Sequence, residues 1–178
     1  MKVVGIAGGS GAGKTTLIER LIPALKAQGQ RVSVVKHAHH GLEIDHPGKD
    51  TFRHREAGAF EVVAASPRRL VLMREFEQEA ALSVHHMIAE LYEGVDWVLV
   101  EGFRHSGLPK VEVVRPEAAL PAQYPSDPFV VCIACDAPEQ LPTPTGLPMV
   151  ALSEGNALAQ WLLHNGNRFE YDSEQFAD

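Results

Sequence analysis

Short apolar runs alternate with amphipathic stretches along the chain, and this alternation predicts strands and helices in turn. Residues 1–7 form a run rich in valine and isoleucine, which is typical of a strand buried on both faces. Leucines recur at every fourth position over residues 14–28 and predict a helix with one apolar stripe: Leu17, Leu21 and Leu25. We expect Pro23 to kink this helix or to interrupt its hydrogen bonds. Residues 31–36 form a second apolar run, so a parallel pair of strands with a right-handed crossover is predicted.

The rest of the chain continues this alternation. Further strands are expected at 60–65, 69–73, 97–100, 110–114, 129–134 and 149–152. Further helices are expected at 50–57, around 84–91 and after residue 153, with Asp50 and Ser153 as N-caps. The pattern predicts an α/β protein with a mostly parallel sheet and helices on both of its faces. We expect one domain over residues 1–166, followed by an acidic, frayed tail over residues 167–178.

Length and composition agree with a single globular domain. The chain has 178 residues, of which 45% are apolar and 22% charged, and these values exclude wholesale disorder. Sixteen basic and 23 acidic residues give a net charge of −7, which argues against a dedicated nucleic-acid-binding protein. No apolar run approaches the roughly 18 residues that span a bilayer, and the first residues do not resemble a signal peptide. We therefore expect a cytoplasmic protein with no membrane partner.

A glycine-rich segment at the end of the first strand carries the strongest chemical signal. Residues 8–15 read GGSGAGKT, which matches the phosphate-binding pattern G-x-x-x-x-G-K-[ST] without a gap. Glycines allow the backbone to wrap a polyphosphate closely, and the following helix directs its positive end to the same place. The segment predicts a nucleotide site of the P-loop NTPase kind, and the alternative is a plain glycine turn between a strand and a helix. The expected phosphate-binding residues are Gly11, Ala12, Gly13, Lys14, Thr15 and Thr16.

A bound nucleotide of this kind requires Mg²⁺, and two residues are predicted to hold it. The Thr15 hydroxyl would bind the ion directly, and an acidic residue at the carboxyl end of a neighbouring strand would hold it through water. Glu101 follows the apolar run 97–100 and has this position. The alternatives are that Glu101 makes an ordinary loop contact, or that Asp45 or Asp50 holds the metal instead.

The stretch 37–58 is longer than most connections in a compact domain and is rich in basic residues and histidine. We expect a basic cluster in and next to this stretch to bind a second phosphorylated ligand or a pterin. Its residues are Lys36, His39, His40, Lys49 and Arg53. Two alternatives stay open, a zinc site and polar residues that are simply solvated.

The two cysteines, Cys132 and Cys135, have a CxxC spacing but lie in an apolar strand, where residues three apart point to opposite faces. We expect two separate core thiols rather than a redox pair or half of a zinc site.

Several segments together resemble the molybdopterin-guanine dinucleotide biosynthesis protein B family, MobB. The likeness spans roughly residues 3–104 and rests on specific segments more than on the phosphate loop, which many unrelated enzymes share. The match covers the phosphate loop with TTL at 15–17, the helix segment LIPAL at 21–25, KHxHH at 36–40, DxPGKD at 45–50, AGA at 57–59 and VEGF at 100–103. The His-His and Pro-Gly-Lys-Asp segments are far more specific than the phosphate loop.

The resemblance implies a GTP-binding homodimer with at most weak GTP hydrolysis. Such a protein is thought to act as an adapter that assists the guanylyltransferase attaching GMP to molybdopterin. The chain lacks the Asn-Lys-x-Asp motif of guanine-specific GTPases, and Asp136, which follows the run 129–134, is a weak candidate for contacting the base. GTP rather than ATP therefore rests on the resemblance alone.

Two other functions compete with the adapter. A small-molecule kinase of the nucleoside type has a similar phosphate loop, but it needs an acceptor pocket and an arginine-bearing lid. The chain offers scattered arginines and no compact lid segment: Arg53, Arg55, Arg68, Arg69 and Arg74. An efficient switch GTPase would need a residue that positions water near the γ-phosphate, for which His39, His40 and Gln78 are only nominal candidates.

Overall fold

The computed structural model describes residues 1–38, 41–42, 44–118 and 120–172. Contacts divide the chain into two compact units, where the sequence predicted one domain. We call Met1–His37 with Ser83–Asp178 the sheet unit, and Ala38–Leu82 the insert unit. Within the described residues, no helix is both long enough and apolar enough to cross a bilayer.

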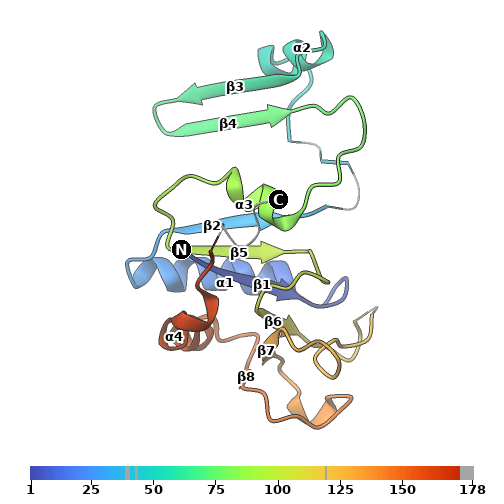
Figure 1. The fold of residues 1–178 in the computed structure, drawn as a ribbon, viewed down its shortest axis with the longest axis vertical. Coiled ribbons are helices and arrows are strands. Elements are labelled where there is room, and N and C mark those ends of the chain that lie inside the picture. Colours follow the sequence, from blue (N-terminus) through green and yellow to red (C-terminus); the bar gives the residue numbers. More distant parts are fainter. Residues whose placement is uncertain (39–40, 43, 119, 173–178) are drawn as a thin grey trace. The chain divides into compact units, whose positions relative to one another are not determined.

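The sheet unit is built on six parallel strands in the order β2-β5-β1-β6-β7-β8 (Figure 1). The strands are β1 (Lys2–Ala7), β2 (Val32–Lys36), β5 (Trp97–Glu101), β6 (Lys110–Val113), β7 (Val130–Ala134) and β8 (Met149–Val150). The helices are α1 (Lys14–Ala27), α3 (Val84–Ala89) and α4 (Gly155–His164), with 3₁₀ turns η1 (Pro138–Gln140) and η2 (Gly166–Phe169). Side chains of α1 and α4 share one apolar cluster with the sheet, and those of α3 share another. The prediction of an α/β fold with a parallel sheet and helices on both faces is confirmed.

The strand order gives the sheet a point where its connections diverge. β1 connects through α1 to β2 on one side, whereas β6 connects to β7 on the other side. The carboxyl ends of β1 and β6 are adjacent, because Ala7 pairs with Glu112. In open parallel sheets, ligands bind in the crevice outside the strand ends at such a switch point.

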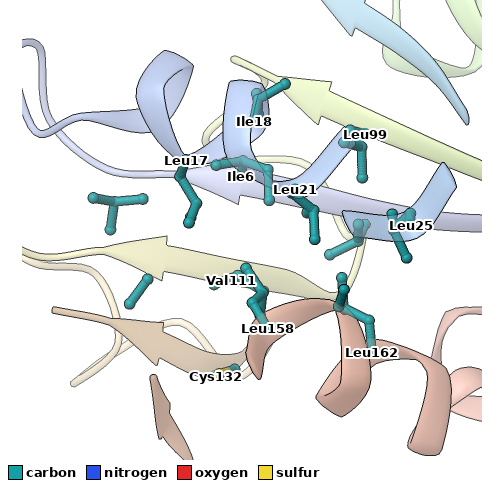
Figure 2. Packing of buried hydrophobic residues seen from close by; sticks show 14 of the residues in the cluster. Ile6, Leu17, Ile18, Leu21, Leu25, Leu99, Val111, Cys132, Leu158 and Leu162 are labelled. Atoms are coloured by element: carbon teal, nitrogen blue, oxygen red, sulfur yellow. The ribbon is translucent and has the colours of Figure 1, made fainter. Parts of the chain in front are cut away.

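The apolar stripe of α1 forms the centre of the larger core cluster. Figure 2 shows the labelled side chains of this cluster: Leu17, Leu21 and Leu25 of α1, Val111 of β6, and Leu158 and Leu162 of α4. α1 continues past Pro23 to Ala27, with Pro23 on its exposed side, so the helix does not end there. Pro23 has no N–H to donate, so the hydrogen bonds of the helix are interrupted at this residue, as expected. Cys132 lies in this cluster and Cys135 in a different one, and both thiols are free and buried. The expectation of two separate core thiols is confirmed.

Three expectations about caps and termini were wrong. Lys49, rather than Asp50, is the N-cap of α2 (Asp50–Glu56), and Glu154, rather than Ser153, is the N-cap of α4. Neither cap uses its side chain, so the cap preferences of Asp and Ser did not decide where these helices begin. Residues 167–171 are ordered, since Phe169 is 1% exposed and the backbone N–H of Tyr171 donates to the Met1 carbonyl at 3.0 Å. The remaining part of the predicted tail, 173–178, lies outside the described residues.

The insert unit consists of α2 and an antiparallel hairpin of β3 (Glu61–Ser66) and β4 (Arg69–Arg74). Val63 pairs with Leu72 and Ala65 with Leu70, so these four side chains share one face of the hairpin. Val63, Leu70 and Leu72 are 57%, 68% and 45% exposed. We call these four residues the hairpin apolar face. A two-stranded ribbon is marginally stable without further packing.

Candidate polyphosphate site

The segment Gly8–Gly13, which we call the glycine loop, joins β1 to α1 at the switch point of the sheet. Gly8, Gly11 and Gly13 have φ values of 135°, 75° and 101°, which residues with a side chain rarely adopt. A Cβ on Gly8 would lie 2.5 Å from the carbonyl oxygen of Val113, so only glycine lets the loop pass the end of β6. The sequence predicted this loop from its glycine spacing, and the structure shows why glycine is needed at Gly8.

Lys14, which the sequence predicts to bind phosphate, lies over the glycine loop. Its Nζ donates hydrogen bonds to the carbonyl oxygens of Gly8 and Gly9, at 3.0 and 2.8 Å. Burial lowers the pKa of Lys14 from its ordinary value, and the charges of Lys36 and Arg104 lower it further, against the opposing effect of Glu101. The ammonium group is thus held over the loop with the Glu101 carboxylate and the cations Lys36 and Arg104 close enough to affect it.

The first turn of α1 has backbone donors available. The N–H groups at a helix N-terminus have no partner within the helix. Here no side chain caps them, and no acidic residue lies in the first turn. The N–H of Ala12 is an exception among the predicted contacts, because it donates to the Gly9 carbonyl at 3.2 Å. The hydrogen bonds of α1 begin with the N–H of Leu17, which donates to the Gly13 carbonyl at 3.0 Å, so the N–H groups of residues 14–16 have no acceptor within the helix.

Thr15 and Glu101 meet across the junction of β1 and β5. Glu101 is the last residue of β5 and pairs in register with Ile6 of β1 and Lys36 of β2. Its side chain is buried, and its Oε1 accepts a hydrogen bond from Thr15 Oγ1 at 3.0 Å. The same carboxylate forms an ion pair with Lys36 Nζ. The structure thus brings together the two residues that the sequence proposed for Mg²⁺ and adds a cation to them.

The chemistry of this pair suits Mg²⁺ held mainly by phosphate oxygens. Mg²⁺ prefers oxygen ligands and is commonly bound through one or two protein oxygens plus substrate phosphates and water. A hydroxyl and a carboxylate supply two such oxygens, and among the described residues no cluster of three metal-ligating side chains exists. The competitor Asp45 is engaged within the insert unit, where it accepts from Thr51 Oγ1 at 3.0 Å and pairs with Arg55 at 3.5 Å. Asp50 lies 4.0 Å from Arg53.

The residues of the predicted cluster for a second anion are divided between the two units, so the cluster stays a prediction. Lys36 belongs to the sheet unit and pairs with Glu101, whereas Lys49 and Arg53 belong to the insert unit. His39 and His40 lie outside the described residues. Lys36 is the last residue of β2, where its ammonium group pairs with the Glu101 carboxylate.

Asp136 lies just beyond β7, at the same edge of the sheet as the glycine loop. It is exposed, and its Oδ1 accepts a hydrogen bond from the backbone N–H of Leu152, which follows β8, at 2.8 Å. This contact fixes the carboxylate between the ends of β7 and β8.

Sequence reasoning missed two arginines near the loop. The guanidinium of Arg115, two residues after β6, lies over Gly13, with Nη2 3.4 Å from the position that a Cβ there would occupy. Arg104 follows β5 and lies near enough to affect the charge of Lys14. Both are brought to the loop by the pairing of distant strands, and no local motif marks either of them.

Comparison with known proteins identifies the family. The family model described as molybdopterin guanine dinucleotide synthesis protein B, MobB, matches residues 3–136, a stretch that includes the glycine loop, Glu101 and Asp136. The chain belongs to the MobB family.

Individual MobB relatives agree with this assignment. The molybdopterin-guanine dinucleotide biosynthesis adapter protein of Escherichia coli K12 is 40% identical over 134 residues, covering 74% of this chain and 77% of that protein. The Haemophilus influenzae adapter protein is 39% identical over 141 residues, covering 78% and 77%. A crystal structure of a molybdopterin-guanine biosynthesis protein B superposes with a TM-score of 0.69 at 27% identity, covering 92% of this chain and 97% of that one. The family resemblance inferred from the sequence motifs is thereby confirmed.

Proposed function

We propose that this MobB-family chain binds Mg²⁺–GTP at the glycine loop and acts as an adapter in molybdopterin guanine dinucleotide biosynthesis. The adapter role rests on the similarity to proteins of that name in two bacteria. The observation that carries the nucleotide site is the placement of Lys14 over the loop, beside uncapped N–H groups of α1. When bound, Mg²⁺ would neutralise charge on the phosphate oxygens, while Thr15 and Glu101 would fix its position.

GTP is proposed over ATP because the family is that of a guanine dinucleotide pathway. The position of Asp136 supports this choice, since a carboxylate can accept the two N–H groups of a guanine edge. The backbone N–H of Leu152 donates to Oδ1 of Asp136, and Oδ2 of Asp136 accepts no hydrogen bond within the described part of the chain.

The same geometry argues for slow hydrolysis at most. Glu101 is the carboxylate that contacts the start of α1, and it already accepts a hydrogen bond from Thr15 and pairs with Lys36. A carboxylate tied to a hydroxyl and an ammonium group is a poor base for activating water. The chain would therefore hold the nucleotide more readily than it would cleave it, as suits an adapter.

Nucleoside-type kinase activity is disfavoured because two of the arginines that a lid would need are already paired with acids. Arg55 pairs with Asp45 and Glu75, and Arg74 pairs with Glu61, all within the insert unit. These side chains serve the packing of that unit instead of projecting free toward a phosphate.

We also propose that the chain forms a homodimer and that it assists the molybdenum cofactor guanylyltransferase, with molybdopterin as the shared substrate of the pathway. The hairpin apolar face supports self-association, because exposed apolar patches on small units mark interaction surfaces. Analytical ultracentrifugation of Leu70→Glu tests the dimer: the wild type should sediment as a dimer and the variant as a monomer. Identical sedimentation as dimers would exclude this face.

Calorimetry tests the nucleotide proposal directly. GTP, ATP and purified guanylyltransferase are titrated into the wild-type protein, each with and without Mg²⁺. The proposal expects binding of GTP that strengthens with Mg²⁺, weaker binding of ATP, and a measurable complex with the transferase. If neither GTP nor ATP binds, the proposed site is refuted.

A further inference from the structure

The side chain of Arg115 occupies an electrostatically unfavourable position. Its Nη2, Cζ and Nε lie 3.4, 3.5 and 3.7 Å from the point where a Cβ on Gly13 would stand, so the guanidinium group rests on the glycine loop at the N-terminus of α1. This end of the helix carries a partial positive charge, and no acidic side chain lies in its first turn. Two positive groups are thus placed in contact.

No acid compensates for this arrangement. Among the residues that the structure describes, Arg115 forms no ion pair and no side-chain hydrogen bond, although acids lie elsewhere on this net-acidic chain. The half-buried arginines Arg55 and Arg74 each pair with an acid, whereas Arg115 is exposed and rests on Gly13 without one among the described residues. An unpaired guanidinium over an uncapped helix end is the arrangement expected where an anion completes the site.

The backbone that carries Arg115 is fixed. Its carbonyl oxygen accepts a hydrogen bond from the N–H of Ala118 at 3.1 Å, which closes a turn containing Pro116. Further along the same loop, the N–H groups of Gln123 and Tyr124 donate to the buried Glu112 carboxylate of β6 at 2.6 and 2.7 Å. These hydrogen bonds tie the described residues on either side of the loop to β6 and to the turn at Arg115.

The order of the strands tells which part of a nucleotide Arg115 would meet. Glu101 ends β5, on one side of β1, whereas Arg115 follows β6, on the other side. Asp136 follows β7, one strand farther in the same direction. If the metal and terminal phosphate lie near Glu101 and the base near Asp136, Arg115 falls between them.

We infer that Arg115 is a binding residue for the nucleotide, its guanidinium group contacting the phosphates nearest the nucleoside from the side opposite Glu101. This inference rests on the proposed nucleotide site and adds a residue to it. Because these phosphates are present in both the di- and the triphosphate, the contact is made with GTP and GDP alike. The loss of Arg115 should therefore weaken both ligands by the same factor.

The test uses Arg115→Ala and Arg115→Gln, the second of which keeps much of the packing over Gly13. The matched control is Arg168→Ala, an exposed arginine in η2, whose neighbours Phe169 and Glu170 pack at the amino end of β1. Calorimetry with Mg²⁺ should show GTP and GDP affinities each reduced about ten- to a hundredfold in both Arg115 variants and unchanged in the control. Without nucleotide, the Tm of both variants should equal or exceed that of the wild type, because a cation has been removed from the positive helix end.

Three outcomes would overturn the inference. Wild-type affinity in the Arg115 variants would show that the guanidinium group takes no part in binding. A loss confined to GTP would place it at the terminal phosphate. A lower Tm without nucleotide, with unchanged affinity in Arg115→Gln, would assign the side chain to folding alone. Failure of the wild type to bind any nucleotide would instead remove the proposed function, and the role of Arg115 with it.

Discussion

Replacing Lys14 by alanine isolates the contribution of the loop to nucleotide binding. The Lys14 ammonium group now makes two hydrogen bonds, to the carbonyls of Gly8 and Gly9. Two comparable bonds to phosphate would each contribute about 1.5–3 kcal/mol, less a discount because the ammonium group is partly solvated. A net loss of about 2–4 kcal/mol corresponds to roughly a thirtyfold to thousandfold weaker GTP affinity.

Replacing Lys14 should change the stability of the unliganded protein much less than its affinity for GTP. Burial lowers the pKa of Lys14, which means that its charge is held at some cost in the unliganded fold. The free energy of unfolding of Lys14→Ala without nucleotide should therefore fall by less than about 1 kcal/mol. Lys26→Ala is the matched control on the same helix, because Lys26 lies in the last turn of α1, where its positive charge interacts favourably with the negative end of the helix dipole. That variant should lose about 0.3–1 kcal/mol of stability and no GTP affinity.

Calorimetry with GTP and Mg²⁺ gives the affinities, and urea unfolding followed by circular dichroism gives the stabilities. The reasoning is refuted if Lys14→Ala binds GTP as tightly as the wild type. It is also refuted if Lys26→Ala loses as much affinity as Lys14→Ala, because the effect would then be a general consequence of lowering the positive charge of α1.

Three other substitutions or modifications test separate parts of the account. Mg²⁺ should raise the GTP affinity of Glu101→Gln about tenfold less than it raises that of the wild type, while GTP binding without Mg²⁺ should be no weaker. Calorimetry with and without Mg²⁺ measures both affinities, and an unchanged effect of Mg²⁺ would contradict the metal assignment. Burial raises the pKa of Cys132 from 9.0 to about 12, so at pH 8 this thiol should react with iodoacetamide roughly a thousandfold more slowly in the native state than in urea. The contribution of the protonated thiol to stability should be lost as the pH rises from 9 toward 12. Fast labelling of the Cys132 peptide in the native protein, detected by mass spectrometry, would contradict this prediction. Gly155→Ala should destabilise the fold by about 1–3 kcal/mol, since its Cβ would lie 2.8 Å from the Cβ of Arg20, whereas Gly146→Ala, with nothing within 4 Å, should be neutral in urea unfolding.

The elements that the sequence predicted well are those with a strong local pattern. The leucine stripe of α1 and the valine-rich run of β1 each bury their apolar side chains as expected. Helix starts were less predictable because α2 and α4 begin without side-chain caps, so their first residues depend on the packing of the whole unit. The tail after residue 166 was misjudged because its charged residues obscured Phe169, whose ring packs 5.6 Å from that of Trp97.

The residues of the site that could be predicted from the sequence are likewise those marked by a local pattern. The glycine loop and Lys14 are adjacent in the sequence, and Glu101 was found because it ends an apolar run. The ion pair of Glu101 with Lys36 and the position of Arg115 depend on which strands become neighbours, β2 with β5 and β1 with β6. A single sequence does not state that order, so the charged residues that it brings together had to come from the structure.

A crystal structure of the chain with GTP and Mg²⁺ is the most direct test of the claim that the glycine loop holds a polyphosphate. The account predicts phosphate oxygens within hydrogen-bond distance of the backbone N–H groups of Lys14, Thr15 and Thr16. It also predicts that Lys14 Nζ leaves the carbonyls of Gly8 and Gly9 for the phosphates. A nucleotide bound elsewhere, with Lys14 still on those two carbonyls, would contradict it.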